Sequence, residues 1–370
     1  MRIGIDASSL LCPEPRGEGK TLLRLYQEIA RLRPDFEFVL FGDASAGKVV
    51  LPALPNARIV TFSCPGFRWN TWENVGLPWQ AWRAGCDVLH ATSSGAPRWT
   101  PLPVVMTVHD LIPLLFDDGQ SLQERTRFAV RLRNGLRAAR AVIAVSQHTQ
   151  DDLLRLFSEH VPAIQVVPWG GDPVTGTVYP RPVLDPYVLA FGGGAPRKNT
   201  EFTIRSFAQA AADHVDIKLV ILGVGRAVDQ RRVMQIAAAQ GIADRLVLPG
   251  FISEAQLPAY YQHALCLSYL SLYEGFGLPV LEAMSHGVPV LASARTSIPE
   301  VVGEAGVLVN PDRFTEVVTA FRELLEDVAL RERLRKRGVL RSSEFSWERC
   351  AKSIIAILTA AVASPKKPRA

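Results

Sequence analysis

Residues 273–287, YEGFGLPVLEAMSHG, join a glycine-rich loop to a helix, and this junction guides the interpretation of the whole chain. Gly275 and Gly277 allow the backbone to approach a ligand closely, because they carry no side chain. Pro279 suits the first turn of a helix, where its missing N–H has no partner to lose, and Gly287 ends the helix. The loop therefore brings free N–H groups and the positive end of a helix dipole to one place, which favours a diphosphate.

Two carboxylates flank the start of this helix, Glu274 in the loop and Glu282 eight residues later. The spacing alone favours a plain interpretation, in which Glu282 complements the helix dipole and Glu274 is a solvated loop residue. The longer stretch 274–293, EGFGLPVLEAMSHGVPVLAS, resembles the signature of the retaining glycosyltransferases of family 4, which have the GT-B fold. The resemblance implies that Glu274 contacts the transferred sugar and that Glu282 holds the ribose of the nucleotide. It also implies donor contacts from the loop residues Gly275, Phe276, Gly277 and Leu278.

The composition is that of a soluble globular protein with room for two domains: 370 residues, 48% hydrophobic and 21% charged. No apolar run reaches the length of a transmembrane helix, and the N-terminal apolar stretch meets Asp6 too soon for a signal peptide. The five cysteines are scattered without a C-x-x-C pair, which argues against a zinc site or a disulfide framework and fits a reducing cytoplasm. A net charge of +5 suits an anionic partner, and it does not choose among a nucleotide, an anionic membrane surface and nucleic acid.

Short apolar runs rich in β-branched residues alternate with helical patterns along the chain. In the first half they predict strands at residues 2–6, 36–42, 58–62, 87–91, 104–109, 141–146 and 165–168. In the second half they predict strands at residues 187–192, 218–223, 245–249, 264–268, 288–292 and 306–310. The alternation is typical of βαβ units, so the predicted fold class is α/β, with two doubly wound parallel sheets.

A segment rich in glycine and proline, residues 170–186, separates the two halves and is interpreted as a linker. The GT-B resemblance implies two Rossmann-like domains that face each other across a cleft, with a C-terminal helix crossing back to the first domain. The expected acceptor domain is then 1–172 together with the helix 347–363, and the expected nucleotide-sugar domain is 173–346.

Two cations follow the first predicted strand of the second half, in the sequence FGGGAPRKN. A dinucleotide-binding fingerprint fails here, because Arg197 stands where the third glycine would be. Arg197 and Lys198 instead lie where a loop enters a helix, and both can neutralise a diphosphate; an ordinary solvated pair is the alternative. Family 4 has a matching R-K pair, so the resemblance implies that both residues bind the donor.

A second glycine-rich stretch, PEPRGEGKT at residues 13–21, is superficially similar to a phosphate-binding loop. The Walker pattern requires glycine where this chain has Glu14, which excludes an ATP-binding loop of that kind. Gly17 and Gly19 still open a helix after the first strand, and the resemblance implies that this loop borders the donor phosphates and the acceptor. A plain strand-to-helix turn is the alternative for either glycine.

Two further motifs follow predicted strands, at the edge where open α/β sheets bind ligands. His109 lies in TVHDLIP, and although a lone histidine there is more often structural, the resemblance implies a place beside the transferred sugar. Asp110 is expected to orient the same loop. In PGFISE, the resemblance implies contacts with the nucleobase from Phe251 and Ile252, although Phe251 is equally suited to the core.

A cluster of tryptophans and a run of arginines each have two interpretations. The tryptophans are Trp69, Trp72, Trp79 and Trp82. Their spacing favours core packing on one helical face for most of them, with Trp69 as a candidate sugar platform. The arginines are Arg125, Arg127, Arg131, Arg133, Arg137 and Arg140. They predict either a solvated helix face or an interfacial helix that meets anionic lipid.

No Asp-x-Asp motif occurs, although glycosyltransferases that hold their donor through a divalent metal typically use one. We therefore expect neither a metal nor another cofactor. Arg197, Lys198 and helix N-termini would stabilise the leaving diphosphate instead.

The chain is thus predicted to be a glycosyltransferase similar to family 4, which moves one hexosyl unit with retention from a nucleotide sugar to a saccharide acceptor. TVHDLIP with GGGAPRKN is most similar to the mannosyltransferase-type branch, so GDP-mannose is the first choice of donor, and UDP-glucose or another nucleotide sugar stays open. The expected acceptors are lipid-linked saccharides in surface-polysaccharide synthesis. The protein is expected in the cytoplasm, peripheral on the inner face of the membrane, without a nucleic-acid partner.

Two alternatives come from other classes of protein. The failed glycine fingerprints, and the missing acidic ribose ligand at the usual offset, argue against an NAD-dependent oxidoreductase. A non-catalytic scaffold that binds a nucleotide sugar or a membrane is the other alternative. The presence of Glu274, Glu282, Arg197, Lys198 and His109 argues against it.

Overall fold

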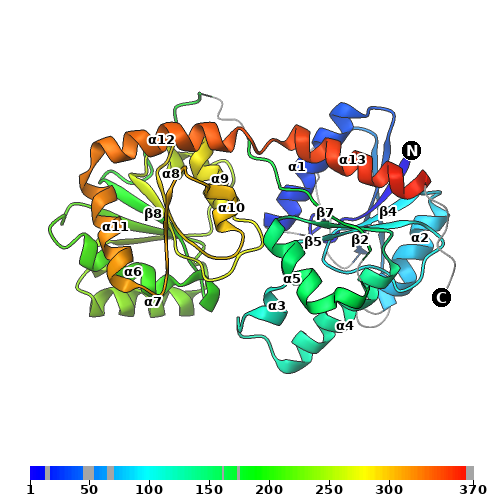
Figure 1. Ribbon diagram of the computed structural model, residues 1–370, viewed down its shortest axis with the longest axis horizontal. Helices are drawn as coiled ribbons and strands as arrows, with labels where there is room; N and C mark the ends of the chain where they lie inside the picture. The colour runs from blue at the N-terminus through cyan, green and yellow to red at the C-terminus, as the bar shows by residue number, and fades with distance from the viewer. Residues whose placement is uncertain (13–16, 45–53, 65–70, 161, 173–175, 364–370) are drawn as a thin grey trace. The chain divides into compact units, whose positions relative to one another are not determined.

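The computed structural model describes residues 1–12, 17–44, 54–64, 71–160, 162–172 and 176–363 (Figure 1). The chain forms two compact units. Unit 1 comprises Met1–Leu114, Ser121–Gly170 and Ser346–Ala370, and unit 2 comprises Leu115–Gln120 and Gly171–Phe345. Each unit is built on a parallel sheet with helices, which confirms the predicted α/β class with two Rossmann-like sheets.

In unit 1, the described strands form a parallel sheet in the order β3-β2-β1-β4-β5-β6-β7. The strands are β1 (Arg2–Asp6), β2 (Glu37–Asp43), β3 (Ala57–Phe62), β4 (Val88–Ala91), β5 (Val104–Val108), β6 (Ala141–Ala144) and β7 (Ile164–Val166). Ile3 of β1 pairs with Phe38 of β2 on one side and with Val88 of β4 on the other. The chain runs outward from β1 to β3 and then returns to the other side of β1, so a topological switch point lies between β1 and β4.

The helices of unit 1 include one from each end of the chain. They are α1 (Gly17–Leu32), α2 (Leu77–Arg83), α3 (Ile112–Leu115, whose last residue is assigned to unit 2), α4 (Leu122–Ala138), α5 (Gln147–Phe157) and α13 (Trp347–Ala363). The C-terminal α13 packs against α1, as a helix that returns to the first unit should. Its buried face repeats at helical spacing through Ala351, Ile354 and Leu358. The exposed ion pair Arg31–Glu348, at 3.3 Å, contributes little, so apolar burial holds the helix.

In unit 2, the described strands form a parallel sheet in the order β10-β9-β8-β11-β12-β13. They are β8 (Tyr187–Phe191), β9 (Lys218–Leu222), β10 (Leu246–Gly250), β11 (Cys266–Tyr269), β12 (Val290–Ser293) and β13 (Val307–Val309). The helices are α6 (Thr200–Ala210), α7 (Ala227–Ala239), α8 (Leu257–Gln262), α9 (Leu278–Ser285), α10 (Ile298–Val302), α11 (Phe314–Glu326) and α12 (Val328–Ser342). The same outward-and-return topology places the switch point of this sheet between β8 and β11.

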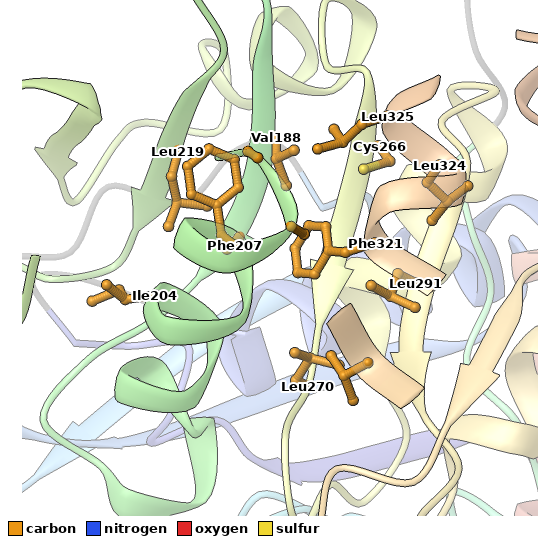
Figure 2. Packing of buried hydrophobic residues seen from close by; sticks show 14 of the residues in the cluster. Val188, Ile204, Phe207, Leu219, Cys266, Leu270, Leu291, Phe321, Leu324 and Leu325 are labelled. Atoms are coloured by element: carbon orange, nitrogen blue, oxygen red, sulfur yellow. The ribbon is translucent and has the colours of Figure 1, made fainter. Parts of the chain in front are cut away.

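An apolar cluster holds α6 and α11 on the sheet of unit 2. Figure 2 shows Phe207 of α6 near Phe321 of α11, with ring centroids 6.2 Å apart at an interplanar angle of 69°. The strands contribute Val188, Leu219, Cys266 and Leu291. Burying each phenylalanine stabilises the fold by ~1.5–3 kcal/mol. This packing fixes β8 next to β11, and with them the loops that leave their carboxyl ends.

The predicted common face of the tryptophans is wrong. Trp72 is 1% exposed and stacks on Phe62 with ring centroids 5.3 Å apart, whereas Trp79 and Trp82 are 54% and 52% exposed. Residues Trp72–Gly76 form a π-helical turn before α2 begins. Such a turn takes one residue more than an α-helical turn, which rotates the residues that follow by ~100°. Trp79 therefore leaves the face on which Trp72 is buried.

The arginines at residues 125–140 do not share one surface either. Arg131 donates through Nε to Glu73 at 2.6 Å, and the two side chains are only 12% and 3% exposed. Arg125 and Arg140 donate to backbone carbonyls of their own unit. The exposed members are Arg127, Arg133 and Arg137. Arg131 thus belongs to the interior, contrary to its predicted place on a solvated or lipid-facing helix surface.

Two predictions lie outside the described residues: Trp69 as a sugar platform, and Glu14 in its loop. The predicted strands all occur, with ends that differ by up to two residues from those predicted. Within the described part of the chain, no helix combines the length and the hydrophobicity that a membrane span requires.

Candidate functional site

In unit 2, the loops that follow β8 and β11 meet at the carboxyl edge of the sheet, on either side of the switch point. The N–H of Leu272 donates to the carbonyl of Arg197 at 2.7 Å, which ties the two loops together. Asn199 has a left-handed backbone, with φ of +53°, and its side chain donates to the carbonyl of Leu270. These contacts fix Arg197 and Lys198 just before α6 begins, facing the loop after β11.

Glu274 accepts hydrogen bonds from both predicted diphosphate ligands. Lys198 Nζ lies 2.7 Å from Glu274 Oε1, and Arg197 Nη1 lies 3.2 Å from the same oxygen. Lys198 also donates to the hydroxyl of Tyr269 at 3.2 Å. Glu274 is only 9% exposed, so these are largely buried ion pairs. The structure therefore brings the residue predicted to hold the sugar and the two predicted to hold the diphosphate into one cluster.

The protonation states in this cluster follow from burial and charge. Burial alone raises the pKa of Glu274, but the charges of Lys198 and Arg197 and the hydrogen bond from Lys198 outweigh it, so the pKa lies below its ordinary value. Burial, and then the charge of Glu274, raises the pKa of Tyr269 well above its ordinary value, so its hydroxyl keeps its proton. At neutral pH the cluster is thus one carboxylate between two cations.

Asp118 is a second carboxylate on Arg197, and no sequence pattern pointed to it. It lies in the segment Leu115–Gln120, which belongs to unit 2. Its Oδ2 accepts from Arg197 Nε at 3.0 Å, and its Oδ1 accepts from the Arg197 backbone N–H at 3.1 Å. A phosphate would need the same guanidinium and N–H donors, so Asp118 and a phosphate would compete for Arg197.

Two hydroxyls support the loop that begins with Glu274. Ser297 Oγ donates to the carbonyls of Glu274 and Phe276, at 2.9 and 3.0 Å, and Thr296 Oγ1 accepts from the N–H of Glu274 at 3.1 Å. Gly277 has a φ of +107°, which other residues rarely adopt, and it precedes the first residue of α9. The predicted glycine-rich entry to the helix is therefore present and rigidly held.

The side chains around this entry have different roles. Phe276 is 6% exposed and packs edge-on against Phe345, so its side chain belongs to the core and only its backbone is left for a donor. Gly275 is buried and Leu278 is half-buried. The first N–H groups of α9 have no acceptor within the helix, as at any helix N-terminus.

Glu282, on α9, is oriented by a buried tyrosine. The hydroxyl of Tyr261 donates to Glu282 Oε2 at 2.8 Å. Tyr261 is 1% exposed and stacks on His286, with ring centroids 5.2 Å apart. Burial, and then the charge of Glu282, raises the pKa of Tyr261 well above its ordinary value, so it stays a donor at neutral pH. This contact fixes the carboxylate predicted to hold the ribose.

Phe251 follows β10 and is 63% exposed, so it is not a core residue. Its ring lies against Gly225, where an added Cβ would come within 2.1 Å of a ring carbon. Gly225 therefore makes room for the ring in the loop after β9. An exposed aromatic face held in place in this way suits stacking on a nucleobase. The neighbouring Ile252 is half-buried.

In unit 1, His109 follows β5 with its ring fixed in orientation. His109 Nε2 lies 2.7 Å from the carbonyl oxygen of Thr92. Because a carbonyl only accepts, Nε2 carries the proton and Nδ1 is the acceptor in the neutral ring. The ring stacks on Trp169 with centroids 5.7 Å apart, and Glu18 Oε1 lies 3.7 Å from Nε2.

Other predicted residues of unit 1 shape the loops around His109. A Cβ at Gly19 would lie 2.2 Å from the carbonyl oxygen of Ser9, so glycine lets the first turn of α1 pack directly on the loop after β1. Gly17 has open space at that position. Asp110 Oδ1 accepts from the N–H of Ile112 at 3.0 Å, which orients the loop as expected.

A pocket of about 310 Å³ lies beside His109, where the loops after β1, β4 and β5 meet at the switch point. It is lined by Ser8, Ser9, Glu18, Ser93, Ser94, His109, Asp110, Phe128 and Arg131. The sequence analysis did not identify the pairs Ser8–Ser9 and Ser93–Ser94 as site residues. They could have been found because each pair comes shortly after a buried strand, β1 or β4.

The predicted site residues divide between the units. Gly17, Gly19 and His109 belong to unit 1, whereas Arg197, Lys198, Phe251, Ile252, Glu274, Gly275, Phe276, Gly277, Leu278 and Glu282 belong to unit 2. Among the described residues, no group of three or more His, Cys, Asp and Glu side chains is arranged to hold a metal ion. A metal-independent reaction remains a prediction.

Comparison with known proteins gives matches along most of the chain. The family model "Glycosyltransferase Family 4" matches residues 15–174, and "Glycosyl transferases group 1" matches residues 178–341. The O-antigen chain mannosyltransferase B of Escherichia coli is 31% identical over 265 residues, which cover 68% of this chain and 68% of that protein. The serotype-specific mannosyltransferase WbdA of Escherichia coli is 27% identical over 68% of this chain, but the match spans only 32% of that protein.

The fold also matches a solved structure over its whole length. A sucrose-phosphate synthase from Thermosynechococcus elongatus superimposes with a TM-score of 0.79 at 21% identity, covering 99% of this chain and 100% of that one. That likeness concerns the fold, and it identifies the two parallel-sheet units as those of a GT-B protein. With one family model on each half of the chain and a mannosyltransferase relative at 31% identity, the chain belongs to the group 1 glycosyl transferases of family 4.

Proposed function

We propose that this glycosyltransferase moves one hexosyl unit, with retention of configuration, from a nucleotide sugar to a saccharide acceptor. The observation that carries the proposal is the cluster at the switch point of unit 2, where Glu274 lies between Arg197 and Lys198. Two cations held against one carboxylate suit a ligand that has both a diphosphate and a sugar. Mannose from GDP-mannose is the first candidate, because both relatives described above are named mannosyltransferases.

Each part of the donor then has a partner in unit 2. Arg197 and Lys198 neutralise the diphosphate, with the N–H groups at the start of α9. Glu282, held by Tyr261, accepts from the ribose hydroxyls. Phe251 stacks on the nucleobase, and Glu274 accepts from hydroxyls of the sugar.

The favoured chemistry is a front-side substitution. The bond between the anomeric carbon and the diphosphate oxygen breaks, the acceptor oxygen bonds to that carbon on the same face, and the acceptor proton passes to the leaving phosphate. Arg197 and Lys198 stabilise the charge that develops on the diphosphate. Glu274 is a poor covalent nucleophile, because two cations already share its charge. Its role is to position the sugar, and that of His109 is to lie beside the same sugar.

The proposed acceptor is a lipid-linked saccharide in the synthesis of a polysaccharide or glycoconjugate. An O-antigen mannosyltransferase among the relatives supports this choice. The exposed arginines of α4, Arg127, Arg133 and Arg137, would meet anionic lipid on the inner face of the membrane.

A thermal-shift panel tests the proposal directly. The full chain is heated with GDP-mannose, GDP, UDP-glucose, UDP and NAD, each at about one hundred times an assumed Kd. A bound ligand at that excess stabilises by ~2.7 kcal/mol, which raises Tm by roughly 5–10 °C. We expect a shift with a nucleotide sugar and its diphosphate and none with NAD. A rise in Tm with NAD and with none of the other ligands would contradict the proposal.

The remaining alternative is a scaffold that binds a nucleotide sugar without transferring it. Release of nucleoside diphosphate from the donor that gives the largest shift separates the two functions. Hydrolysis or transfer supports the enzyme, and both must be lost in Glu274→Gln. A donor that binds tightly and stays intact with every acceptor would support the scaffold.

A further inference from the structure

The pocket beside His109 contains two buried hydroxyls without partners. Ser8 is 7% exposed, and both Ser8 Oγ and Ser9 Oγ are buried with no hydrogen bond to any described residue. Such groups lose their hydration on folding and gain nothing in return, unless a ligand bonds to them. Because both side chains line the pocket, a ligand with hydroxyl groups of its own would satisfy them.

The surrounding contacts hold these serines in place without using their hydroxyls. The backbone N–H of Ser8 donates to Asp6 Oδ1 at 3.1 Å, and the carbonyl of Ser9 is covered by the first turn of α1 at Gly19. Across the switch point, Ser93 Oγ donates to Glu18 Oε1 at 2.9 Å. Other contacts therefore hold Ser8 and Ser9 in place, and their hydroxyls are left unused.

The charges that line the pocket disfavour an anion. Its carboxylates are those of Glu18 and Asp110, and its arginine is Arg131. The guanidinium of Arg131 is paired with the buried Glu73 at 2.6 Å and lies directly against Gly95, where an added Cβ would come within 2.3 Å of Nε. Arg131 is thus fixed in place, and its positive charge is already neutralised by Glu73. The carboxylates leave a negative surplus among the lining residues.

From these features we propose that the pocket binds an uncharged sugar ring of the acceptor and rejects sugars that carry a phosphate or a carboxylate. The proposal rests on the transferase function proposed above, and it narrows the class of acceptor. Carboxylates accept hydrogen bonds from sugar hydroxyls, and serine hydroxyls can both donate to them and accept from them. The half-buried Phe128 offers an apolar face to the ring. A volume of about 310 Å³ suits a small ligand of this kind.

Matched pairs of probes test the charge preference on the full chain. Methyl α-glucoside and methyl α-glucuronide differ only at the sixth carbon, as do mannose and mannose 6-phosphate. Binding is measured by saturation-transfer NMR and calorimetry, with and without saturating nucleoside diphosphate. We expect the neutral member of each pair to bind at least fivefold more tightly, and Glu18→Gln to reduce that ratio. Equal or tighter binding of the anionic members would overturn the proposal.

Serine variants test the site itself. Ser8→Ala and Ser9→Ala should each weaken binding of the neutral glycosides about fivefold, the usual effect of one lost hydrogen bond. Their Tm should stay unchanged or rise, because the removed hydroxyls support nothing in the fold. Ser158→Ala, at an exposed serine of the same unit, is the control. Unchanged glycoside binding in both pocket variants would place the acceptor elsewhere.

The same measurements distinguish this proposal from the function on which it rests. Nucleoside diphosphate binding depends on the cluster around Glu274 in unit 2, and it is measured separately. If the diphosphate binds and the neutral sugars do not, only the acceptor site is wrong. If neutral sugars bind and no nucleotide does, the transferase proposal fails while the pocket is a sugar site.

Discussion

Replacement of Glu274 by glutamine should tighten the binding of free nucleoside diphosphate. Glu274 Oε1 lies 2.7 Å from Lys198 Nζ and 3.2 Å from Arg197 Nη1, so a diphosphate that binds these cations comes close to a buried carboxylate. Two unit charges ~5 Å apart repel each other by ~0.8 kcal/mol at the dielectric of water and by ~3 kcal/mol at an effective dielectric of 20. Removing the repulsion corresponds to a gain of roughly 4- to 100-fold in affinity.

Transfer should fall steeply in the same variant, because the sugar loses the carboxylate that positions its reacting carbon. Lys198→Ala should weaken the binding of free nucleoside diphosphate, whereas Glu274→Gln should tighten it. It removes a charge-assisted contact worth ~1.5–3 kcal/mol, so both free diphosphate and nucleotide sugar should bind about 10- to 100-fold more weakly. Calorimetry with both ligands separates these effects from each other.

Glu201→Gln is the matched control for Glu274→Gln. It removes one negative charge from the exposed first turn of α6, next to the same loop, and it touches neither cation. Its effect on affinity should be small, because an exposed charge is screened by water and salt. If Glu274→Gln weakens free diphosphate as much as Lys198→Ala does, Glu274 is part of the nucleotide site and the proposed division between sugar and phosphate is wrong.

Three further predictions concern metal, membrane and pH. Transfer should persist in excess EDTA because no Asp-x-Asp motif is present; full loss that magnesium or manganese restores would contradict this. Replacing Arg127, Arg133 and Arg137 with glutamate should abolish salt-sensitive binding to anionic vesicles and leave nucleotide binding intact; vesicle binding like that of the parent would leave α4 as a solvated face. Burial, and then the charge of His109, lowers the pKa of His90 to about 3, below the ordinary ~6.5. The unfolded chain therefore takes up a proton on this histidine before the folded chain does. The stabilisation from neutral His90 is complete above pH ~6.5, and it falls by ~1.4 kcal/mol as the pH drops to 5.5. Urea unfolding at pH 7.5 and 5.5 should show this loss in the parent and not in His90→Gln, and equal losses in both would rule out His90 as the source.

The proximity of the predicted donor-site residues could be anticipated in part, because most of them lie in two short stretches of the sequence. The stretch from Glu274 to Glu282 contains its own glycines, helix start and carboxylates, and Arg197 with Lys198 directly follows a recognisable strand. Local pattern therefore placed these residues on loops at the carboxyl edge of one sheet. The ion pairs among them could not be predicted, because they depend on the pairing of β8 with β11. Asp118 was missed for the same reason, since no local pattern around residues 115–120 indicates that it pairs with Arg197.

The pocket of unit 1 could not be predicted from local sequence patterns. Ser8 and Ser94 are far apart in the chain and meet only because β4 pairs with β1 across the switch point. Arg131 illustrates the same limit, because its helix has an arginine-rich sequence typical of a surface, and only the buried Glu73 shows that this residue faces inward. Both candidate sites thus lie at the edge of a sheet that its topology selects. Most residues of the donor site lie in two short stretches of the sequence, whereas those of the unit 1 pocket come from loops far apart in the sequence. Short stretches of sequence were thus enough to predict the proposed nucleotide-sugar site, whereas the proposed acceptor class rests on hydroxyls and charges that only the folded sheet brings together.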